Sequence, residues 1–278
     1  MEQWLYCSDV DGTLARQVFG LTEDTCRLVH QMVEQDILFT IVTGRYLSTS
    51  LPVIEACHLK VPAICLSGSL IYHCEKKQIE KVWAIDSATA EKVAQCLQSL
   101  QNPYSLVLYK EEEQRCLLYG TEPSQYGAST LRNNLGLIHD EERVRSDLCS
   151  CVTEGQVLIF DMVGGEQTLR KACELLQELQ EIECYLHQSP YNPSRWILDV
   201  VAAGSGKGTA LRWLKEQLGA DYSAAFGDNY NDLPMLQAAD LAVVVAEAPN
   251  PVKEAADVIL PPTVNCVPDF ILQRENRK

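Results

Sequence analysis

Two aspartates, Asp9 and Asp11, stand one residue apart in the segment CSDVDGTLA (residues 7–15), directly after a short apolar run and directly before Gly-Thr. In extended backbone, side chains two residues apart point to the same side, so both carboxylates would face one reacting group. Such a pair can supply a nucleophile and a proton donor or acceptor. The competing interpretation is a solvated turn, and the rest of the chain decides between them.

Three further polar clusters have residue types that suit phosphate chemistry. They are TGR at 43–45, GSGKG at 204–208 and GDNYND at 227–232. A phosphoryl group is negatively charged, so a carboxylate can attack it only when a cation neutralises both groups. Carboxylates from Asp9 and Asp228 could hold Mg²⁺, and Lys207 would add a side-chain charge. GSGKGT does not satisfy the Gly-x4-Gly-Lys-Ser/Thr pattern of a nucleotide P-loop, which argues against a kinase.

The elements that must position these clusters alternate along the chain ends. Apolar runs predict strands at 4–10, 37–42 and 62–66, with helices at 22–35 and 46–57 between them. The pattern resumes with a helix that Gly219 ends, then strands and a further helix. This alternation predicts a parallel sheet with right-handed crossovers, whose strand ends carry the polar clusters. The elements of this second stretch are expected at 206–219, 222–228, 231–239, 240–246 and 257–260.

The middle of the chain has a different pattern. Helical spacing predicts helices at 87–100 and 166–180, and a further helix at 124–136. Strands are expected at 105–110 and 115–120 as a hairpin around the acidic turn EEEQ, and then at 157–163, 183–188 and 195–201. We therefore predict a discontinuous core domain, residues 1–82 and 191–278, with an α+β module inserted at 83–190.

Composition excludes several classes of protein. The 278 residues carry a net charge of −15, which disfavours binding to nucleic acid or to anionic membranes. No apolar run approaches the roughly eighteen residues that cross a bilayer, and the first residues lack a secretory pattern. The twelve cysteines are spread without a CxxC pair, which favours reduced thiols. We expect a cytoplasmic protein without membrane or nucleic-acid partners, and the sequence leaves its oligomeric state open.

The four clusters together resemble those of the haloacid dehalogenase (HAD) superfamily hydrolases. The segments are DVDGTL, TGR, LDVVAAGSGKGTAL and GDNYNDLPML, and they are spread over nearly the whole chain. The position of the inserted module resembles subfamily IIB, which includes Cof-type sugar-phosphate phosphatases and sucrose-phosphate phosphatase. The resemblance implies a Rossmann-like α/β core with a parallel sheet, covered by an α+β cap of the C2 type.

The resemblance also implies roles for individual residues. Asp9 would be the nucleophile that forms an aspartyl-phosphate, and Asp11 the general acid and base. Lys207 would be the cation beside Asp9 and the phosphoryl oxygens, and Thr43 and the Gly44 amide would hold phosphate. The implied Mg²⁺ ligands are Asp9, the backbone carbonyl of Asp11 and Asp228, with Asp232 as an outer partner and Asn231 in the same loop.

Two positions leave alternatives open. Arg45 could contact substrate or form a surface ion pair, and the sequence favours neither. Ser67 stands where the family usually has asparagine, and serine reaches less far, so the substrate class is left open.

The function that the sequence predicts is a Mg²⁺-dependent phosphatase for a small phosphorylated metabolite such as a sugar phosphate. A sugar phosphomutase with the same core chemistry is the alternative. A catalytically silent sugar-phosphate-binding protein is disfavoured, because Asp9, Asp11, Lys207 and Asp228 are all present.

Overall fold

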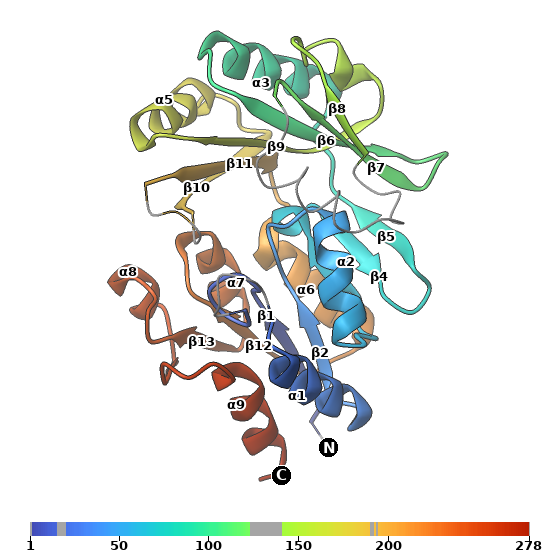
Figure 1. The fold of residues 1–278 in the computed structure, drawn as a ribbon, viewed down its shortest axis with the longest axis vertical. Helices are drawn as coiled ribbons and strands as arrows, with labels where there is room; N and C mark the ends of the chain where they lie inside the picture. The colour runs from blue at the N-terminus through green and yellow to red at the C-terminus, as the bar shows by residue number, and fades with distance from the viewer. Residues whose placement is uncertain (1, 16–20, 123–140, 190–191, 193, 278) are drawn as a thin grey trace.

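A computed structural model describes residues 2–15, 21–122, 141–189, 192 and 194–277. The predicted helix at 124–136 lies outside the described residues. Figure 1 shows two layered bodies stacked on each other, with both chain termini at the far end of the lower one. None of the described helices has the length and apolar character that a bilayer crossing requires.

The lower body is a parallel sheet covered by helices. The sheet has the order β14-β13-β12-β1-β2, and every neighbouring pair is parallel. Its strands are short apolar runs that are mostly buried, as expected where helices cover both faces. The strands are β1 (Trp4–Ser8), β2 (Leu38–Ile41), β12 (Tyr222–Gly227), β13 (Leu241–Val245) and β14 (Val258–Leu260).

The helices predicted at 22–35, 46–57, 206–219 and 231–239 are present in this core, each with its ends within two residues of the prediction. Two further helices, at 250–253 and 266–275, were not predicted. The side chain of Thr22 accepts a hydrogen bond from the Thr25 amide at the start of α1, and Gly219 ends α6 in the left-handed conformation. The helices are α1 (Glu23–Glu34), α2 (Leu47–Ala56), α6 (Gly206–Leu218), α7 (Leu233–Ala238), α8 (Asn250–Lys253) and α9 (Cys266–Glu275).

The third predicted strand only touches the parallel sheet. One parallel bridge joins Val42 to Ile64, but β3 (Ala63–Cys65) otherwise pairs antiparallel with β4 (Leu70–His73), which pairs with β5 (Gln78–Val82). The one-turn helix η1 (Leu66–Gly68) reverses the chain between β3 and β4, with positive φ at all three of its residues. The hairpin of β4 and β5 is an element that the sequence analysis did not predict.

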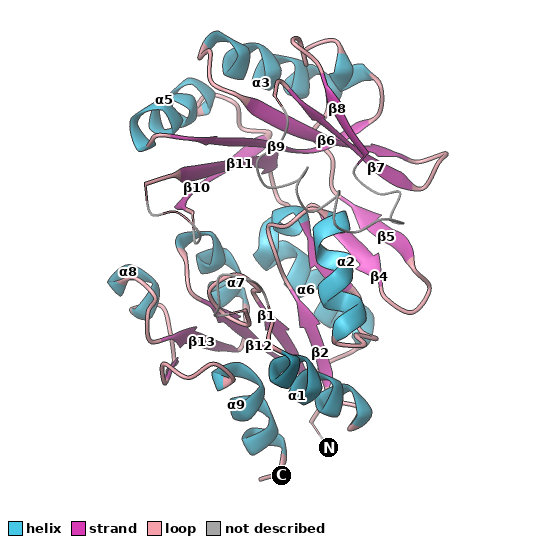
Figure 2. Ribbon diagram, in the orientation of Figure 1, coloured by secondary structure: helices cyan, strands magenta, loops and turns pink. Residues whose placement is uncertain are grey.

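The upper body is a six-stranded sheet with helices on one face. Its order is β10-β11-β9-β6-β7-β8, and β6 and β7 form the hairpin predicted around EEEQ. Helices α3 (Ser87–Ser99) and α5 (Glu166–Leu176) cover the face away from the core (Figure 2). The strands are β6 (Tyr104–Lys110), β7 (Arg115–Gly120), β8 (Glu141–Val144), β9 (Gln156–Gly164), β10 (Ile182–Gln188) and β11 (Trp196–Ala202).

The opposite face of this sheet packs on the core. Side chains such as Val107, Leu158 and Val201 share one apolar cluster with core residues. Strand β11 is paired on both sides within the six-stranded sheet, so this sheet extends past the boundary expected at residue 190. We therefore propose that the inserted module, called the cap below, returns to the core after Ala202.

Candidate active site

Asp9 lies directly beyond the carboxyl end of β1. Its amide donates a hydrogen bond to the carbonyl of Phe226 in β12 (2.9 Å), which fixes it between the two central strands. Lys207, in the first turn of α6, donates from Nζ to Asp9 Oδ1 at 2.7 Å, and both side chains are buried. Burial acts to lower the pKa of Lys207, but the Asp232 and Asp9 carboxylates outweigh it and raise the pKa above its ordinary value. Lys207 therefore stays charged beside Asp9.

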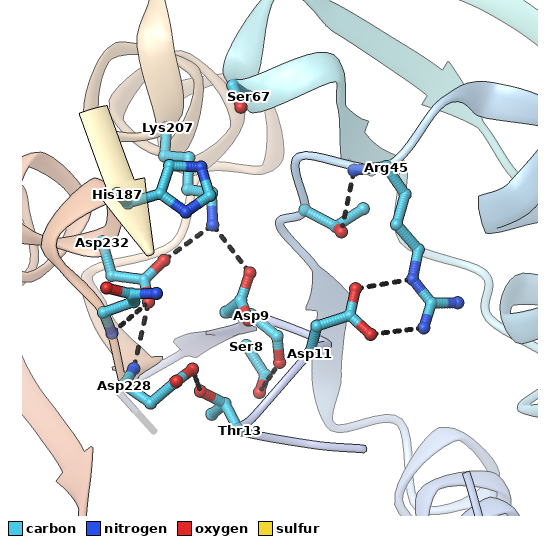
Figure 3. Close-up of polar contacts among 12 residues, drawn as sticks. Ser8, Asp9, Asp11, Thr13, Arg45, Ser67, His187, Lys207, Asp228 and Asp232 are labelled. Atoms are coloured by element: carbon cyan, nitrogen blue, oxygen red, sulfur yellow. Dashed lines mark hydrogen bonds and ion pairs between the residues drawn. The ribbon is translucent and has the colours of Figure 1, made fainter. Parts of the chain in front are cut away.

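Asp232 orders the loop that follows β12. One of its carboxylate oxygens accepts hydrogen bonds from the amides of Asp228 (3.0 Å) and Asn229 (3.1 Å), and the other accepts one from Lys207 at 2.6 Å. Lys207 thus bridges Asp9 and Asp232, as Figure 3 shows. Asp232 lies in the one-turn helix η3 (Tyr230–Asp232) and is fully buried.

Asp228 meets the loop after β1. The hydroxyl of Thr13 donates to Asp228 Oδ1 at 2.7 Å. A Cβ at position 12 would lie 2.3 Å from Asp228 Oδ2, and Gly12 has a φ of +95°. Only glycine fits both the conformation and the close approach. The DVDGT and GDNYND clusters are therefore packed directly against each other.

The aspartates at these strand ends suit a divalent metal ion. Asp9, Asp228 and Asp232 each offer a carboxylate oxygen, and these atoms lie within 4.8 Å of one another. Burial, together with the neighbouring carboxylates, raises the pKa of Asp9 well above its ordinary value and that of Asp228 to about 7. A buried set of oxygen donors with one lysine between them fits a hard cation. The backbone carbonyl of Asp11 as a further ligand stays a prediction.

The loop after β2 holds the TGR cluster against η1. Thr43 is buried, and its amide donates to the carbonyl of Ile64 at 2.9 Å. The Ser67 amide donates to the carbonyl of Thr43 at 3.1 Å, and a Cβ at position 44 would lie 3.2 Å from Ser67 Oγ. Thr43, Gly44 and Ser67 therefore form one packed edge, but their contact with phosphate stays a prediction.

Arg45 pairs with Asp11. Its Nε and Nη2 donate to the two oxygens of the Asp11 carboxylate, and both side chains are partly exposed. This ion pair lies at the same edge as Asp9 (Figure 3). Arg45 therefore forms an ion pair, one of its two expected alternatives, with the residue predicted to move protons. Contact of Arg45 with substrate stays a prediction.

The structure also places residues here that sequence analysis did not select. His187 of β10 is buried, and its Nε2 lies 3.8 Å from an oxygen of Asp199 in β11. Ser67 donates to Asp199 at 2.5 Å. Asp199 stands inside the segment LDVVAAGSGKGTAL, which carries part of the family resemblance, so the sequence could have pointed to it. His187 lies in no such motif. Asn231 lies half-buried in η3, and no hydrogen bond of its side chain is seen among the described residues.

Comparison with known proteins shows which family the chain resembles over its length. A family model for haloacid dehalogenase-like hydrolases matches residues 6–267. Pyridoxal phosphate phosphatase of Escherichia coli is 24% identical over 258 residues, which cover 91% of this chain and 91% of that protein. The 5-amino-6-(5-phospho-D-ribitylamino)uracil phosphatase of Bacillus subtilis is 25% identical over 261 residues, covering 92% and 88%.

Solved structures show the same fold. A sugar phosphatase of HAD subclass IIB matches with a TM-score of 0.73 at 18% identity, over 98% of this chain and 99% of that chain. The predicted α/β fold with its inserted α+β module is thereby confirmed. Because the family model spans almost the entire sequence and these relatives are phosphatases, the chain belongs to the haloacid dehalogenase-like hydrolases and is itself a phosphatase.

Proposed function

We propose that this phosphatase is a Mg²⁺-dependent phosphomonoesterase that acts on a small phosphorylated metabolite, such as a sugar phosphate, through an aspartyl-phosphate on Asp9. The observation that carries the proposal is the buried ion pair between Lys207 and Asp9, with a Nζ–Oδ1 distance of 2.7 Å. The pair keeps a carboxylate and a fixed cation together at the sheet edge, where a phosphoryl group would need both.

In the first step, the free oxygen of Asp9 attacks phosphorus while the bond to the ester oxygen breaks. Lys207 holds the other oxygen of Asp9 and faces the charge that develops on the phosphoryl group. Asp11 gives its proton to the departing alcohol oxygen. In the structure both oxygens of Asp11 accept hydrogen bonds from Arg45, so one oxygen would turn to the leaving group while Arg45 keeps hold of the other.

In the second step, water attacks phosphorus and Asp11 takes the proton from that water. The bond between phosphorus and Asp9 breaks, which releases inorganic phosphate and restores the carboxylate. When bound, Mg²⁺ would supply positive charge beside the phosphoryl oxygens, and Asp9 and Asp228 would hold it, with Asp232 close by. Thr43 and the amide of Gly44 would bind the remaining phosphoryl oxygens.

A panel of phosphate esters tests the proposal. The protein is incubated with Mg²⁺ and sugar phosphates, and both inorganic phosphate and isomerised sugar phosphate are measured. Release of inorganic phosphate by the wild type, and its loss in Asp9→Asn, would support the proposal. An isomer without net phosphate release would instead identify a phosphomutase. The proposed cytoplasmic location is tested separately, by cell fractionation.

A further inference from the structure

A row of polar residues crosses the cap sheet on the face toward the core. Tyr185 of β10 stands opposite Asp199 of β11, Asp199 stands opposite Asp161 of β9, and Asp161 stands opposite Ser105 of β6. Residues directly opposite each other on neighbouring strands have side chains on the same face. These four residues are called the cap row below.

Members of the cap row reach segments at the catalytic edge of the core. Asp199 accepts a hydrogen bond from Ser67 and lies 3.8 Å from the position of a Cβ at Gly44, in the loop predicted to hold phosphate. Asp161 accepts a hydrogen bond from the hydroxyl of Tyr46 at 2.8 Å. Tyr46, which follows Arg45, thus contacts Asp161, and the loop predicted to hold phosphate lies beside Asp199.

The other two members of the cap row, Ser105 and Tyr185, also lie against core residues. The hydroxyls of Ser105 and Tyr46 lie 3.3 Å apart. A Cβ at Gly206, one residue before Lys207, would lie 2.5 Å from the hydroxyl oxygen of Tyr185. The cap row therefore lies over the space between the loop after β2 and the start of α6, where the proposed phosphoryl site would be.

Two carboxylates at the centre of this row are unfavourable for stability. Like charges directly opposite each other on neighbouring strands repel, and removal from water adds to the penalty. Burial and the charge of Asp199 raise the pKa of Asp161 to about 7. A basic side chain, that of His187, lies 3.8 Å from Asp199. The uncharged amide of an asparagine could accept the same hydrogen bonds from Tyr46 and Ser67. The contact between cap and core therefore does not explain why both positions carry an acidic side chain.

We propose that Asp161 and Asp199 select the leaving group of the substrate, and that they favour a neutral, hydroxyl-bearing alcohol over one with a second anionic group. A carboxylate accepts hydrogen bonds from hydroxyls strongly and repels another anion. This inference rests on the proposed phosphomonoesterase function and narrows its substrates to monophosphates of neutral sugars and polyols. Hydroxyls of the substrate would take the places that Tyr46 and Ser67 fill in the structure.

Matched pairs of esters test this selection. Glycerol 3-phosphate has a hydroxymethyl group where 3-phosphoglycerate has a carboxylate, and sorbitol 6-phosphate and 6-phosphogluconate form a second pair with the same difference. We expect the wild type to prefer the neutral member of each pair at least about tenfold in kcat/KM. Asp161→Asn and Asp199→Asn should reduce that preference at least about threefold, because the substituted amides keep the shape and lose the charge. Hydrolysis of p-nitrophenyl phosphate, which has no hydroxyl for the cap row, should fall by a smaller factor than hydrolysis of the neutral member of each pair.

The control is Asp147→Asn, which removes the same charge from an exposed cap loop outside the row. It should leave every preference unchanged. If either variant in the row changed all esters by the same factor, the row would only hold the cap in place and the proposal would be overturned. A wild type without preference within both pairs would overturn it as well. A wild type that hydrolysed neither p-nitrophenyl phosphate nor any other ester would instead refute the proposed function itself.

Discussion

The guanidinium group of Arg45 donates two hydrogen bonds to the carboxylate of Asp11, with distances of 2.7 Å to Oδ2 and 2.5 Å to Oδ1. This two-pronged pairing fixes the orientation of the carboxylate as well as its position. Arg45 and Asp11 come from loops that follow different strands, β2 and β1. We therefore expect Arg45 to act through Asp11, as a positioning residue for proton transfer.

Replacement of Arg45 should affect esters according to their leaving group. Arg45→Lys keeps the positive charge but loses the planar guanidinium group, which donates a hydrogen bond to each oxygen of Asp11. The orientation of the Asp11 carboxylate would therefore be less fixed. We expect kcat to fall roughly tenfold or more for alkyl phosphates, whose basic leaving oxygen needs a proton. With p-nitrophenyl phosphate the loss should be smaller, because that leaving group departs without one. Steady-state kinetics on both classes of ester measure the difference.

Arg170→Lys is the matched control, since Arg170 makes an exposed ion pair with Glu166 on the cap helix α5. It should change neither rate. Equal losses with both classes of ester in Arg45→Lys would mean that Arg45 contacts the phosphoryl group rather than acting through Asp11.

Removal of divalent metal should stop turnover. The carboxylate oxygens of Asp9, Asp228 and Asp232 lie within 4.8 Å of one another. We expect Mg²⁺ to restore activity after chelation and Ca²⁺ to fail, because Ca²⁺ takes more ligands at longer distances of about 2.3–2.6 Å. Mg²⁺ should also raise the melting temperature of the wild type but not that of Asp228→Asn. Full turnover after exhaustive chelation and dialysis would show that the site works without a metal.

Gly68 lets the turn after β3 approach the start of α6. A Cβ there would lie 2.1 Å from the carbonyl carbon of Gly206, and Gly68 has a φ of +103°. Gly68→Ala should lower the free energy of unfolding by about 2–4 kcal/mol. It should also reduce activity, because the added Cβ displaces the first turn of α6, which contains Lys207. Gly165→Ala, with no heavy atom within 4 Å of the added Cβ, should stay within about 1 kcal/mol. Urea denaturation compares the two variants, and similar losses would contradict the steric explanation.

Asp161 should make stability depend on pH. The groups that face it are Tyr46, Asp199, His187 and Ser105, and burial with the Asp199 charge raises its pKa from 3.8 to about 7. Between pH 3.8 and about pH 7, the carboxyl group of Asp161 is protonated in the folded state and ionised in the unfolded state. The free energy of unfolding therefore falls as the pH rises toward 7. The full difference amounts to at most about 4 kcal/mol. Asp161→Asn should therefore stabilise the protein more at pH 8 than at pH 5.

Thermal melts of Asp161→Asn and the wild type at both pH values test this dependence. Asp147→Asn, which removes one acidic group from an exposed cap loop, is the control variant. An offset for Asp161→Asn that was the same at pH 5 and pH 8 would show that this carboxyl does not titrate between them.

The sequence predicted the core well because its signals are local. Each buried strand of the parallel sheet is a short apolar run, and the polar clusters follow directly at the strand ends, so Asp9 and Asp228 could be placed at one edge. The antiparallel pairing of β3 with β4 was missed because the turn between them, at Leu66–Gly68, depends on positive φ at Leu66 and Ser67, which neither residue type signals.

The contacts between cap and core could not be predicted in the same way. The cap row depends on the register of four antiparallel strands, and a shift of one residue would turn Asp161 and Asp199 to the opposite face. Their contacts with Tyr46 and Ser67 depend further on how the cap packs on the core. The pairing of Arg45 with Asp11 likewise depends on two loop conformations that no local pattern determines.

The central claim is that Asp9 carries the phosphoryl group between the two steps. The most direct test is rapid acid quenching of Asp11→Asn during turnover, followed by peptide mass spectrometry. With p-nitrophenyl phosphate as substrate, the first step needs no proton from residue 11, whereas the second step lacks its base, so the intermediate should accumulate in Asp11→Asn. We predict that the peptide containing Asp9 gains the mass of one phosphoryl group, and that Asp9→Asn shows neither this gain nor turnover. Phosphate release by Asp9→Asn within about tenfold of the wild-type rate, or phosphorylation of a different residue, would contradict the account.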